Sequence, residues 1–153
     1  MKKFVIRVYG IGILNNAVLL SEEVGQGKYF TKFPGGGLEW GEGTIHCLER
    51  EFKEELDIEV CVKSHLYTTD FFLQSAFNPD DQIISIYYLV EFKNPANVLE
   101  KVKQQNGKKL VPPVDEHFIW KPLAELSESD VTFPADKKVV SLLKDKYSFS
   151  AKV

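Results

Sequence analysis

The sequence predicts an α/β protein in which one mixed β-sheet is covered by helices on both faces. Several short segments are rich in Val, Ile, Tyr and Phe and end at Gly, Asn or Pro, as β-strands do. Two longer segments, one internal and one near the end of the chain, repeat their apolar residues at helical spacing instead. A chain of 153 residues suits one globular domain, so we expect residues 1–153 to form a single unit.

Each expected strand is bounded by residues that favour turns. The first two strands are joined by a glycine-containing turn at 10–15, and a polar connection over 22–28 leads to a short apolar piece ending at Phe33. Residues 34–37, Pro-Gly-Gly-Gly, then break regular structure, and a further turn is expected within 76–81. The expected strands are residues 3–9, 16–21, 58–62, 66–73, 83–92 and 117–120.

The internal helix is expected over residues 44–56. An apolar stripe runs along one side of it, with spacings of 3, 4 and 4 between its members Ile45, Leu48, Phe52 and Leu56. Gly43 and Thr44 supply the region of its N-terminal cap. The stripe leaves the other sides of this helix free to carry polar groups.

A closing helix is expected over residues 134–147, where a proline begins the segment. Its apolar face is predicted from Val139, Leu142 and Leu143, and a short helical turn is expected before it at 123–126. Residues 94–114 are polar and are interpreted as a partly helical insertion. Its lysines, at positions 101, 103, 108 and 109, are expected to keep the insertion soluble.

Composition narrows the classes of function. A net charge of -3 argues against a general nucleic-acid binder, although bound metal ions can supply positive charge toward a small anionic ligand. The two cysteines, Cys47 and Cys61, make neither a disulfide framework nor a zinc spacing and are expected to be free thiols. No segment is long and apolar enough to span a membrane, so we expect a cytoplasmic protein with a small-molecule substrate.

Three carboxylates of the internal helix point to metal chemistry. At 100° per residue, Glu51, Glu54 and Glu55 fall together on a side away from the apolar stripe, spread over about one turn. Like charges at this spacing repel one another, and such a cluster is what a hard, oxygen-seeking cation requires. Lys53 points elsewhere, whereas Arg50 is placed to hold neighbouring acids by charge-assisted hydrogen bonds. The alternative is an acidic helix face that is simply solvated.

The residues around this cluster resemble the signature of the Nudix hydrolases, and the likeness spans residues 36–58. Gly36 is followed after five residues by Glu42, after seven more by Arg50-Glu51-Phe52, and after one more by Glu54-Glu55. The flanking strands and terminal helix also suit that family's α/β/α sandwich. One position departs from the signature, because Asp57 stands where the family has the glycine that ends the helix. Aspartate tolerates the left-handed conformation this requires, so we expect metal binding to survive.

The resemblance assigns a role to each residue of the signature. It implies Mg²⁺, or Mn²⁺, bound by the helix glutamates together with the backbone carbonyl of Gly35. Arg50 is implied to orient its neighbours. Members of the family place the general base at different positions, and we expect Glu54 to be the base here because one carboxylate not saturated by metal can accept the proton of the attacking water. The implied metal ligands are Glu51, Glu54, Glu55 and Gly35, the implied catalytic residues are Glu54, Glu55 and Arg50, and Glu39 and Glu42 are implied to be structural.

Residues outside the helix are implied to contact the substrate or to complete the metal site. Gly36, Gly37 and Trp40 lie beside the signature helix, and Asp136 follows Pro134 in a turn similar to one whose side chain touches the nucleobase in MutT-like members. Capping of the closing helix is the alternative role for Asp136. Some family members add a distant carboxylate; the candidates Asp80, Asp81, Asp115 and Glu116 are expected to be ordinary surface charges.

The resemblance implies a pyrophosphohydrolase that cuts a nucleoside diphosphate joined to another group into a nucleoside monophosphate and a phosphorylated product. Nucleoside triphosphates, oxidised nucleotides and nucleotide sugars are all open as substrates. The oligomeric state is open as well, with a homodimer as one candidate because many members of the family dimerise. One alternative is a nucleotide-sensing module, which would be expected to have lost its metal-binding glutamates. Another is an isopentenyl diphosphate isomerase, but neither cysteine sits in the context that this chemistry needs.

Overall fold

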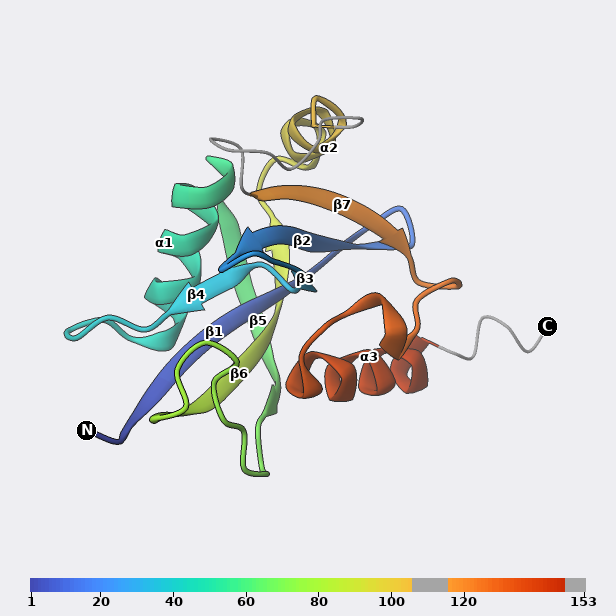
Figure 1. Cartoon of the computed structure of the whole chain (residues 1–153). Helices are drawn as coiled ribbons and strands as arrows, with labels where there is room; N and C mark the ends of the chain where they lie inside the picture. The colour runs from blue at the N-terminus through green and yellow to red at the C-terminus, as the bar shows by residue number, and fades with distance from the viewer. Residues whose placement is uncertain (106–115, 148–153) are drawn as a thin grey trace.

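A computed structural model describes residues 1–105 and 116–147. Its mixed sheet lies between helices, which confirms the predicted fold class (Figure 1). The strands are β1 (Lys3–Leu14), β2 (Ala17–Gly25), β3 (Lys28–Lys32), β4 (Gly35–Gly37), β5 (Val60–Thr68), β6 (Asp81–Phe92) and β7 (Glu116–Pro122). The helices are α1 (Thr44–Leu56), α2 (Pro95–Lys103), the short 3-10 helix η1 (Glu128–Asp130) and α3 (Pro134–Tyr147).

Strand β1 joins two parts of the sheet. Residues 3–12 of β1 pair in parallel with 81–90 of β6, and β6 pairs antiparallel with β5. The end of β1 turns into β2, which is flanked by β3 on one side and β7 on the other. The short β4 runs antiparallel to β1, with Gly36 opposite Val8. The strand order is therefore β3-β2-β1-β6-β5, with β4 and β7 attached to it.

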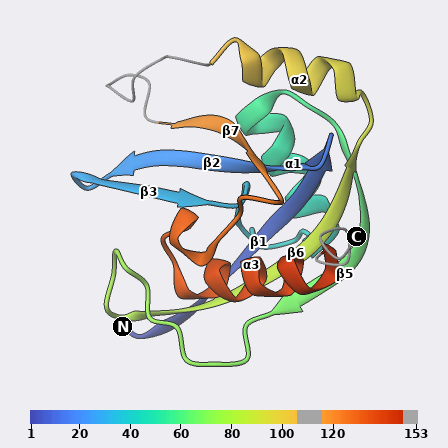
Figure 2. The same cartoon turned by 90° about the vertical axis from the view of Figure 1, so that its right-hand side faces the viewer.

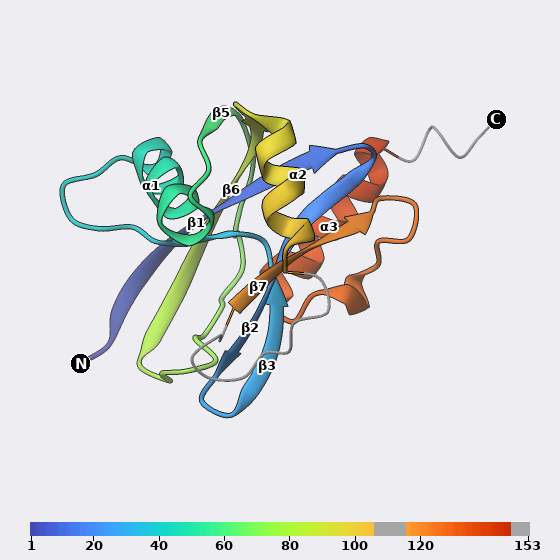
Figure 3. The same ribbon diagram turned by 90° about the horizontal axis from the view of Figure 1, so that it is seen from above.

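The two faces of the sheet carry separate apolar cores. Helix α1 packs on one face with Val8 of β1, whereas α3 packs on the other with Tyr9 and Ile11 of the same strand. Figure 3 shows α1 and α3 on opposite sides of β1, and Figure 2 looks onto α3 as it crosses in front of β1 and β6. Alternate residues of β1 thus serve alternate cores, as the two-residue period of a strand requires.

The expected turn at 10–15 is wrong, because β1 continues to Leu14 and the chain reverses at Asn15 and Asn16, both at positive φ. The glycines of this stretch serve packing instead. A Cβ on Gly10 would lie 2.7 Å from Cε2 of Phe52, and one on Gly12 would lie 2.3 Å from Cζ of Phe92. Aromatic rings therefore occupy the space that side chains at 10 and 12 would need.

Two further expectations for the strands are corrected. The Pro-Gly-Gly-Gly segment does not break the sheet, since residues 35–37 form β4 against β1. The strands expected at 58–62 and 66–73 are one strand, β5, whose register with β6 shifts twice and which ends at Thr68. These register shifts explain why the apolar residues of the segment do not alternate regularly. Phe71 and Phe72 lie exposed in the loop that follows.

Both expected helices form at the predicted bounds, but the residues that each of them buries differ from the prediction. In α1, Ile45 is 48% exposed, whereas Cys47 is fully buried beside the carbonyl of Gly37. Strand β4 presents bare backbone there, so the helix buries this flank as well as its apolar stripe. In α3, Val140 is buried alongside Val139 and Leu143, while Leu142 is only partly buried.

The polar insertion is helical over residues 95–103, where Asn94 caps α2 and Val98 and Val102 are buried. Residues 106–115, with Lys108 and Lys109, lie outside the described residues. Residues 123–126 form a hydrogen-bonded turn that leads to η1. Both cysteines are free thiols, as predicted. Among the described helices, none has the length and apolar character needed to cross a membrane.

Candidate active site

The C-terminal end of α1 has the backbone conformation that the departure from the signature requires. Asp57 is left-handed, with φ 52° and ψ 44°, which confirms the expectation for this position. Its carboxylate lies 2.8 Å from Nζ of Lys53 and 3.2 Å from Nζ of Lys101. Lys101 also donates to the backbone carbonyls of Leu56 and Asp57, so this lysine ties α2 to the end of α1 and is not merely solubilising.

Arg50 organises the acids of the signature. Its Nε and Nη2 donate to the two carboxylate oxygens of Glu42 at 3.0 and 2.7 Å, a bidentate pair. Its Nη1 donates to Glu51 and to Glu54, both at 3.1 Å, and lies 3.6 Å from Glu39. The guanidinium holds the pKa of Glu42 at about 2, well below the usual range of a glutamate. The structure therefore brings both predicted structural acids, together with Glu51 and Glu54, onto one cation, whereas Glu55 is not among its partners.

Strand β4 fits closely between β1 and α1. Gly35 has φ 150°, and a Cβ there would lie 2.0 Å from the carbonyl oxygen of Val8. A Cβ on Gly36 would lie 2.4 Å from Cδ of Glu51, so only glycine leaves room for this carboxylate. The carbonyl of Gly37 also accepts a hydrogen bond of 3.1 Å from Arg50. The glycines thus let backbone and carboxylates share one small space.

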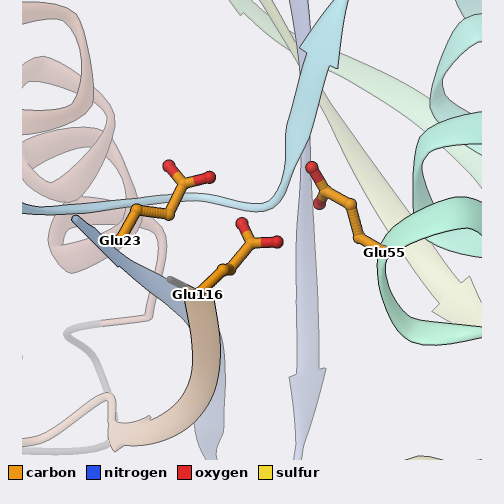
Figure 4. Close-up of side chains that lie close together, drawn as sticks. All are labelled: Glu23, Glu55 and Glu116. Atoms are coloured by element: carbon orange, nitrogen blue, oxygen red, sulfur yellow. The ribbon is translucent and has the colours of Figure 1, made fainter. Parts of the chain in front are cut away.

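A second group of acids forms where three elements meet. Carboxylate oxygens of Glu23 on β2, Glu55 on α1 and Glu116 on β7 lie within 4.8 Å of one another, and Figure 4 shows the three side chains converging. Strand pairing sets Glu23 directly opposite Glu116. The expectation that Glu116 is an ordinary surface charge is therefore wrong, and Glu23 was not predicted as a site residue.

The electrostatics of this carboxylate cluster (Glu23, Glu55 and Glu116) favour bound positive charge. Burial raises the pKa of Glu55 to about 7, and burial together with Glu23 raises that of Glu116 to about 9. One oxygen of Glu55 is buried and makes no hydrogen bond to the described residues. An orphaned carboxylate oxygen among converging acids is the donor set of a hard divalent cation, so the residues present fit Mg²⁺ or Mn²⁺.

The three predicted metal ligands of α1 divide into two groups. Glu51 and Glu54 face Arg50, whereas Glu55 faces the cluster with Glu23 and Glu116. The three remain close on one turn of helix, and the negative charge of Glu51 helps to raise the pKa of Glu55. Glu54 is the most exposed of them, with 57% of its side chain accessible.

A cavity of about 480 Å³ opens beside the cluster, on the α3 side of the sheet. Three aromatic side chains, Phe30, Phe77 and Phe133, line one part of it, with ring centroids 5.4 to 6.3 Å apart. The other lining groups include Glu23 of the carboxylate cluster, and the positively charged Arg7 and Lys32, neither of which was predicted.

Asp136 lies in the wall of this cavity and is almost completely buried. Its Oδ1 accepts a hydrogen bond of 2.6 Å from the hydroxyl of Tyr87. Burial raises the pKa of Asp136 to about 7, so near neutral pH the group exchanges between a neutral donor and a charged acceptor. Its position at the start of α3 therefore places a further titratable carboxylate, besides those of Glu23 and Asp81, in the wall of the cavity.

The other predicted substrate contacts are placed differently. Trp40 is fully exposed and does not line the cavity, and Gly36 and Gly37 lie in β4 on the Arg50 side. Of the distant acids, Asp81 lines the cavity, whereas Asp80 pairs with the amino terminus at 3.9 Å. Asp115 lies outside the described residues.

Comparison with known proteins adds a family and a fold. A sequence profile of the NUDIX domain matches residues 3–143. No functionally curated protein matches the sequence. Among solved structures, the ORF135 protein of E. coli is 21% identical, with a TM-score of 0.66 over 99% of this chain and 94% of that one.

Two other solved structures are similar. The MutT NUDIX hydrolase of Burkholderia pseudomallei is 17% identical, with a TM-score of 0.67 over 92% of this chain and 98% of that chain. An ADP-ribose pyrophosphatase of Streptococcus suis is 14% identical, with a TM-score of 0.58 over 93% of this chain and 90% of that one. Identities this low establish a shared fold and nothing about the substrate.

Proposed function

The chain belongs to the Nudix hydrolase family, and on that premise we propose that it is a metal-dependent pyrophosphohydrolase. It cleaves a nucleoside diphosphate joined to another group into a nucleoside monophosphate and a phosphorylated product. The observation that carries the proposal is the half-buried carboxylate cluster of Glu23, Glu55 and Glu116, which borders a cavity large enough for a nucleoside.

The metal is Mg²⁺ or Mn²⁺ and is held by acids that burial keeps poorly solvated. Glu55 and the two other cluster acids supply its oxygen ligands, and Glu51 and the carbonyl of Gly35 join them as the resemblance implies. Glu54, which the resemblance also implies as a ligand, is assigned to proton transfer instead. When bound, such an ion neutralises phosphate charge and lowers the pKa of an attacking water. The orphaned oxygen of Glu55 supports this assignment, because a buried carboxylate without a partner is costly unless a ligand completes it.

Glu54 is the proposed general base. Its carboxylate is mostly exposed and, among the described residues, pairs with Arg50 alone, so it lies outside the carboxylate cluster and is accessible to water. Arg50 orients it by a hydrogen bond of 3.1 Å. The guanidinium also fixes Glu51 and Glu42, so it positions the acids that act and takes no proton itself.

The nucleoside occupies the cavity on the α3 side. Phe30, Phe77 and Phe133 offer faces on which a base stacks, a contact worth about 1–3 kcal/mol per base. Asp136 is the polar group that selects among bases, because Tyr87 engages only one of its two oxygens. Nucleoside triphosphates, oxidised nucleotides and nucleotide sugars are the substrates to screen.

The test is a phosphate-release screen with Mg²⁺ and then Mn²⁺ across these three substrate classes, coupled to a phosphatase or pyrophosphatase where needed. Glu55→Gln and Glu54→Gln should reduce turnover by on the order of 10³-fold, because each removes metal binding or proton transfer. Glu49→Gln is the matched control, since Glu49 is an exposed acid of the same helix with no partner role in the site. Nucleotide binding without metal-dependent turnover on the whole panel would instead favour a sensing module.

A further inference from the structure

Two cations share one aromatic ring on the floor of the cavity. Cζ of Arg7 lies 5.7 Å from the ring centroid of Tyr9, and Nζ of Lys32 lies 5.5 Å from the same centroid. Both side chains line the cavity, and Lys32 is only 4% exposed. Both positive charges therefore lie near the same ring in the cavity wall, so an anionic group that reaches this part of the cavity is attracted by both.

Arg7 is fixed in place yet has donors to spare. Its Nε donates to the hydroxyl of Tyr9 at 2.6 Å, which sets the plane of the guanidinium. Neither of its terminal nitrogens makes a hydrogen bond to the part of the chain that the structure describes. A planar fork that is held by one nitrogen and open at the other two is suited to bind oxygens of a carboxylate or phosphate.

Lys32 is also incompletely satisfied. Its ammonium has three donors, and its two polar contacts, Oε2 of Glu23 and the carbonyl of Phe33, are both at 3.5 Å. That distance is longer than a good hydrogen bond, which for nitrogen and oxygen is about 2.9 Å. A nearly buried ammonium with only long contacts can gain a closer acceptor from a ligand.

The position of the pair indicates which part of a nucleotide it faces. Phe30 and Lys32 are alternate residues of β3 and both line the cavity, roughly 7 Å apart along the strand. Lys32 in turn contacts Glu23 of the carboxylate cluster. The cations therefore lie between the aromatic part of the cavity, where the base stacks, and the cluster, where the scissile linkage is activated.

We propose that Arg7 and Lys32 form a binding site for the phosphate group that is attached to the ribose of the substrate. The site rests on the function proposed above, and it adds a contact that works without metal. It binds the phosphate retained by the nucleoside monophosphate product, so the protein binds this product more tightly than the corresponding nucleoside. Arg7 contacts none of the proposed metal ligands among the described residues, whereas Lys32 also contacts Glu23 of the carboxylate cluster, so Arg7 is the residue whose replacement tests the phosphate contact apart from the metal.

The test measures binding by titration calorimetry in EDTA, using AMP, GMP, CMP and UMP, each beside its own nucleoside. The wild-type protein should bind at least one monophosphate more than 10-fold more tightly than its nucleoside. Arg7→Gln should weaken that monophosphate about 10-fold or more and leave the nucleoside unchanged, since a charge-assisted hydrogen bond is lost. Lys28→Met removes one charge from the exposed part of β3 and should change neither affinity.

Lys32→Arg provides a second variant, because it keeps a positive charge beside the half-buried Glu23. It should retain most of the preference for the monophosphate. Equal losses of affinity for the monophosphate and the nucleoside in Arg7→Gln would mean that Arg7 contacts the nucleoside part. Equal affinity of the wild type for both ligands would mean that no phosphate site exists. Either result overturns the proposal. The screen for turnover is independent of this binding test. If the wild-type protein preferred the monophosphate but hydrolysed no substrate of the panel, the proposed hydrolase activity would be rejected and the phosphate site would stand.

Discussion

The two sides of the central sheet hold their polar groups in different ways. On the α1 side, charged groups satisfy one another: Arg50 binds four acids of one short segment, and the pKa of Glu42 falls to about 2. On the α3 side, polar groups come from several strands and loops and are incompletely paired, and the pKa of Asp136 rises to about 7. The charged groups around Arg50 thus come from one short segment of the chain, whereas those around the cavity come from residues far apart in the sequence.

Replacing Arg50 should have the largest effect on the site on the α1 side. Arg50→Lys keeps one charge but loses the bidentate pair with Glu42 and the contacts to Glu51 and Glu54. We expect kcat to fall roughly 100-fold, as when the partners that orient metal ligands are removed, while metal-free binding of the monophosphate stays unchanged. Steady-state kinetics and calorimetry on the same preparation measure both. Equal kcat in Arg50→Lys and wild type would show that Arg50 does not position the acids.

A smaller effect is expected from filling the space beside Glu51. Gly36→Ala puts a methyl group 2.4 Å from Cδ of Glu51, so the carboxylate must leave its place. We expect a loss of about 1–3 kcal/mol in the free energy of unfolding, which urea denaturation measures. Gly43→Ala is the matched control, because a Cβ there has no neighbour within 4 Å and φ is -83°. A similar loss in both variants would remove the steric explanation.

The α3 side should differ from the α1 side in its response to pH. Asp136 has an ordinary pKa of 3.8 when unfolded and about 7 when buried, so the folded state binds more protons between these values. Its contribution therefore weakens stability as pH rises from about 4 to 7, by at most about 1.4 kcal/mol per pH unit. Asp136→Asn should flatten this decline in metal-free urea denaturation. If the unfolding free energies of wild type and Asp136→Asn fell equally with rising pH, burial would not raise the pKa of Asp136.

The smallest effect is expected at the end of α1. Asp57→Gly restores the residue of the family signature and relieves the left-handed conformation, a gain of up to about 1 kcal/mol. It also loses exposed ion pairs with Lys53 and Lys101, which are worth about 0.2–1 kcal/mol each. The net change in unfolding free energy should thus stay within about 1 kcal/mol. Asp57→Val is the contrasting variant, because a β-branched residue resists positive φ and should destabilise clearly more.

The α1 side was accessible from the sequence because its residues lie within one segment. Helical periodicity is enough to place Arg50 beside Glu51 and Glu54, and the left-handed state of Asp57 follows from where the helix must stop. The division between Glu51 and Glu55 was not predictable, since it depends on which strands lie over each side of the helix.

The α3 side was mostly hidden from the sequence because long-range pairing creates it. Glu23 and Glu116 meet only through the register of β2 with β7. Arg7 sits in a strand that reads as ordinary core, and only the alternation of β1 shows that it faces the cavity. Gly10 and Gly12 were misread as a turn because the rings that need their space come from α1 and β6.

The most direct test measures turnover and product binding separately in one variant. Glu55→Gln should abolish metal-dependent turnover of the substrate found by screening, while it binds the monophosphate product in EDTA with wild-type affinity. That result would establish that the carboxylate cluster carries the chemistry and that the cavity binds the nucleotide without it. Turnover that survives in Glu55→Gln, or product binding lost together with activity, would contradict the division of labour.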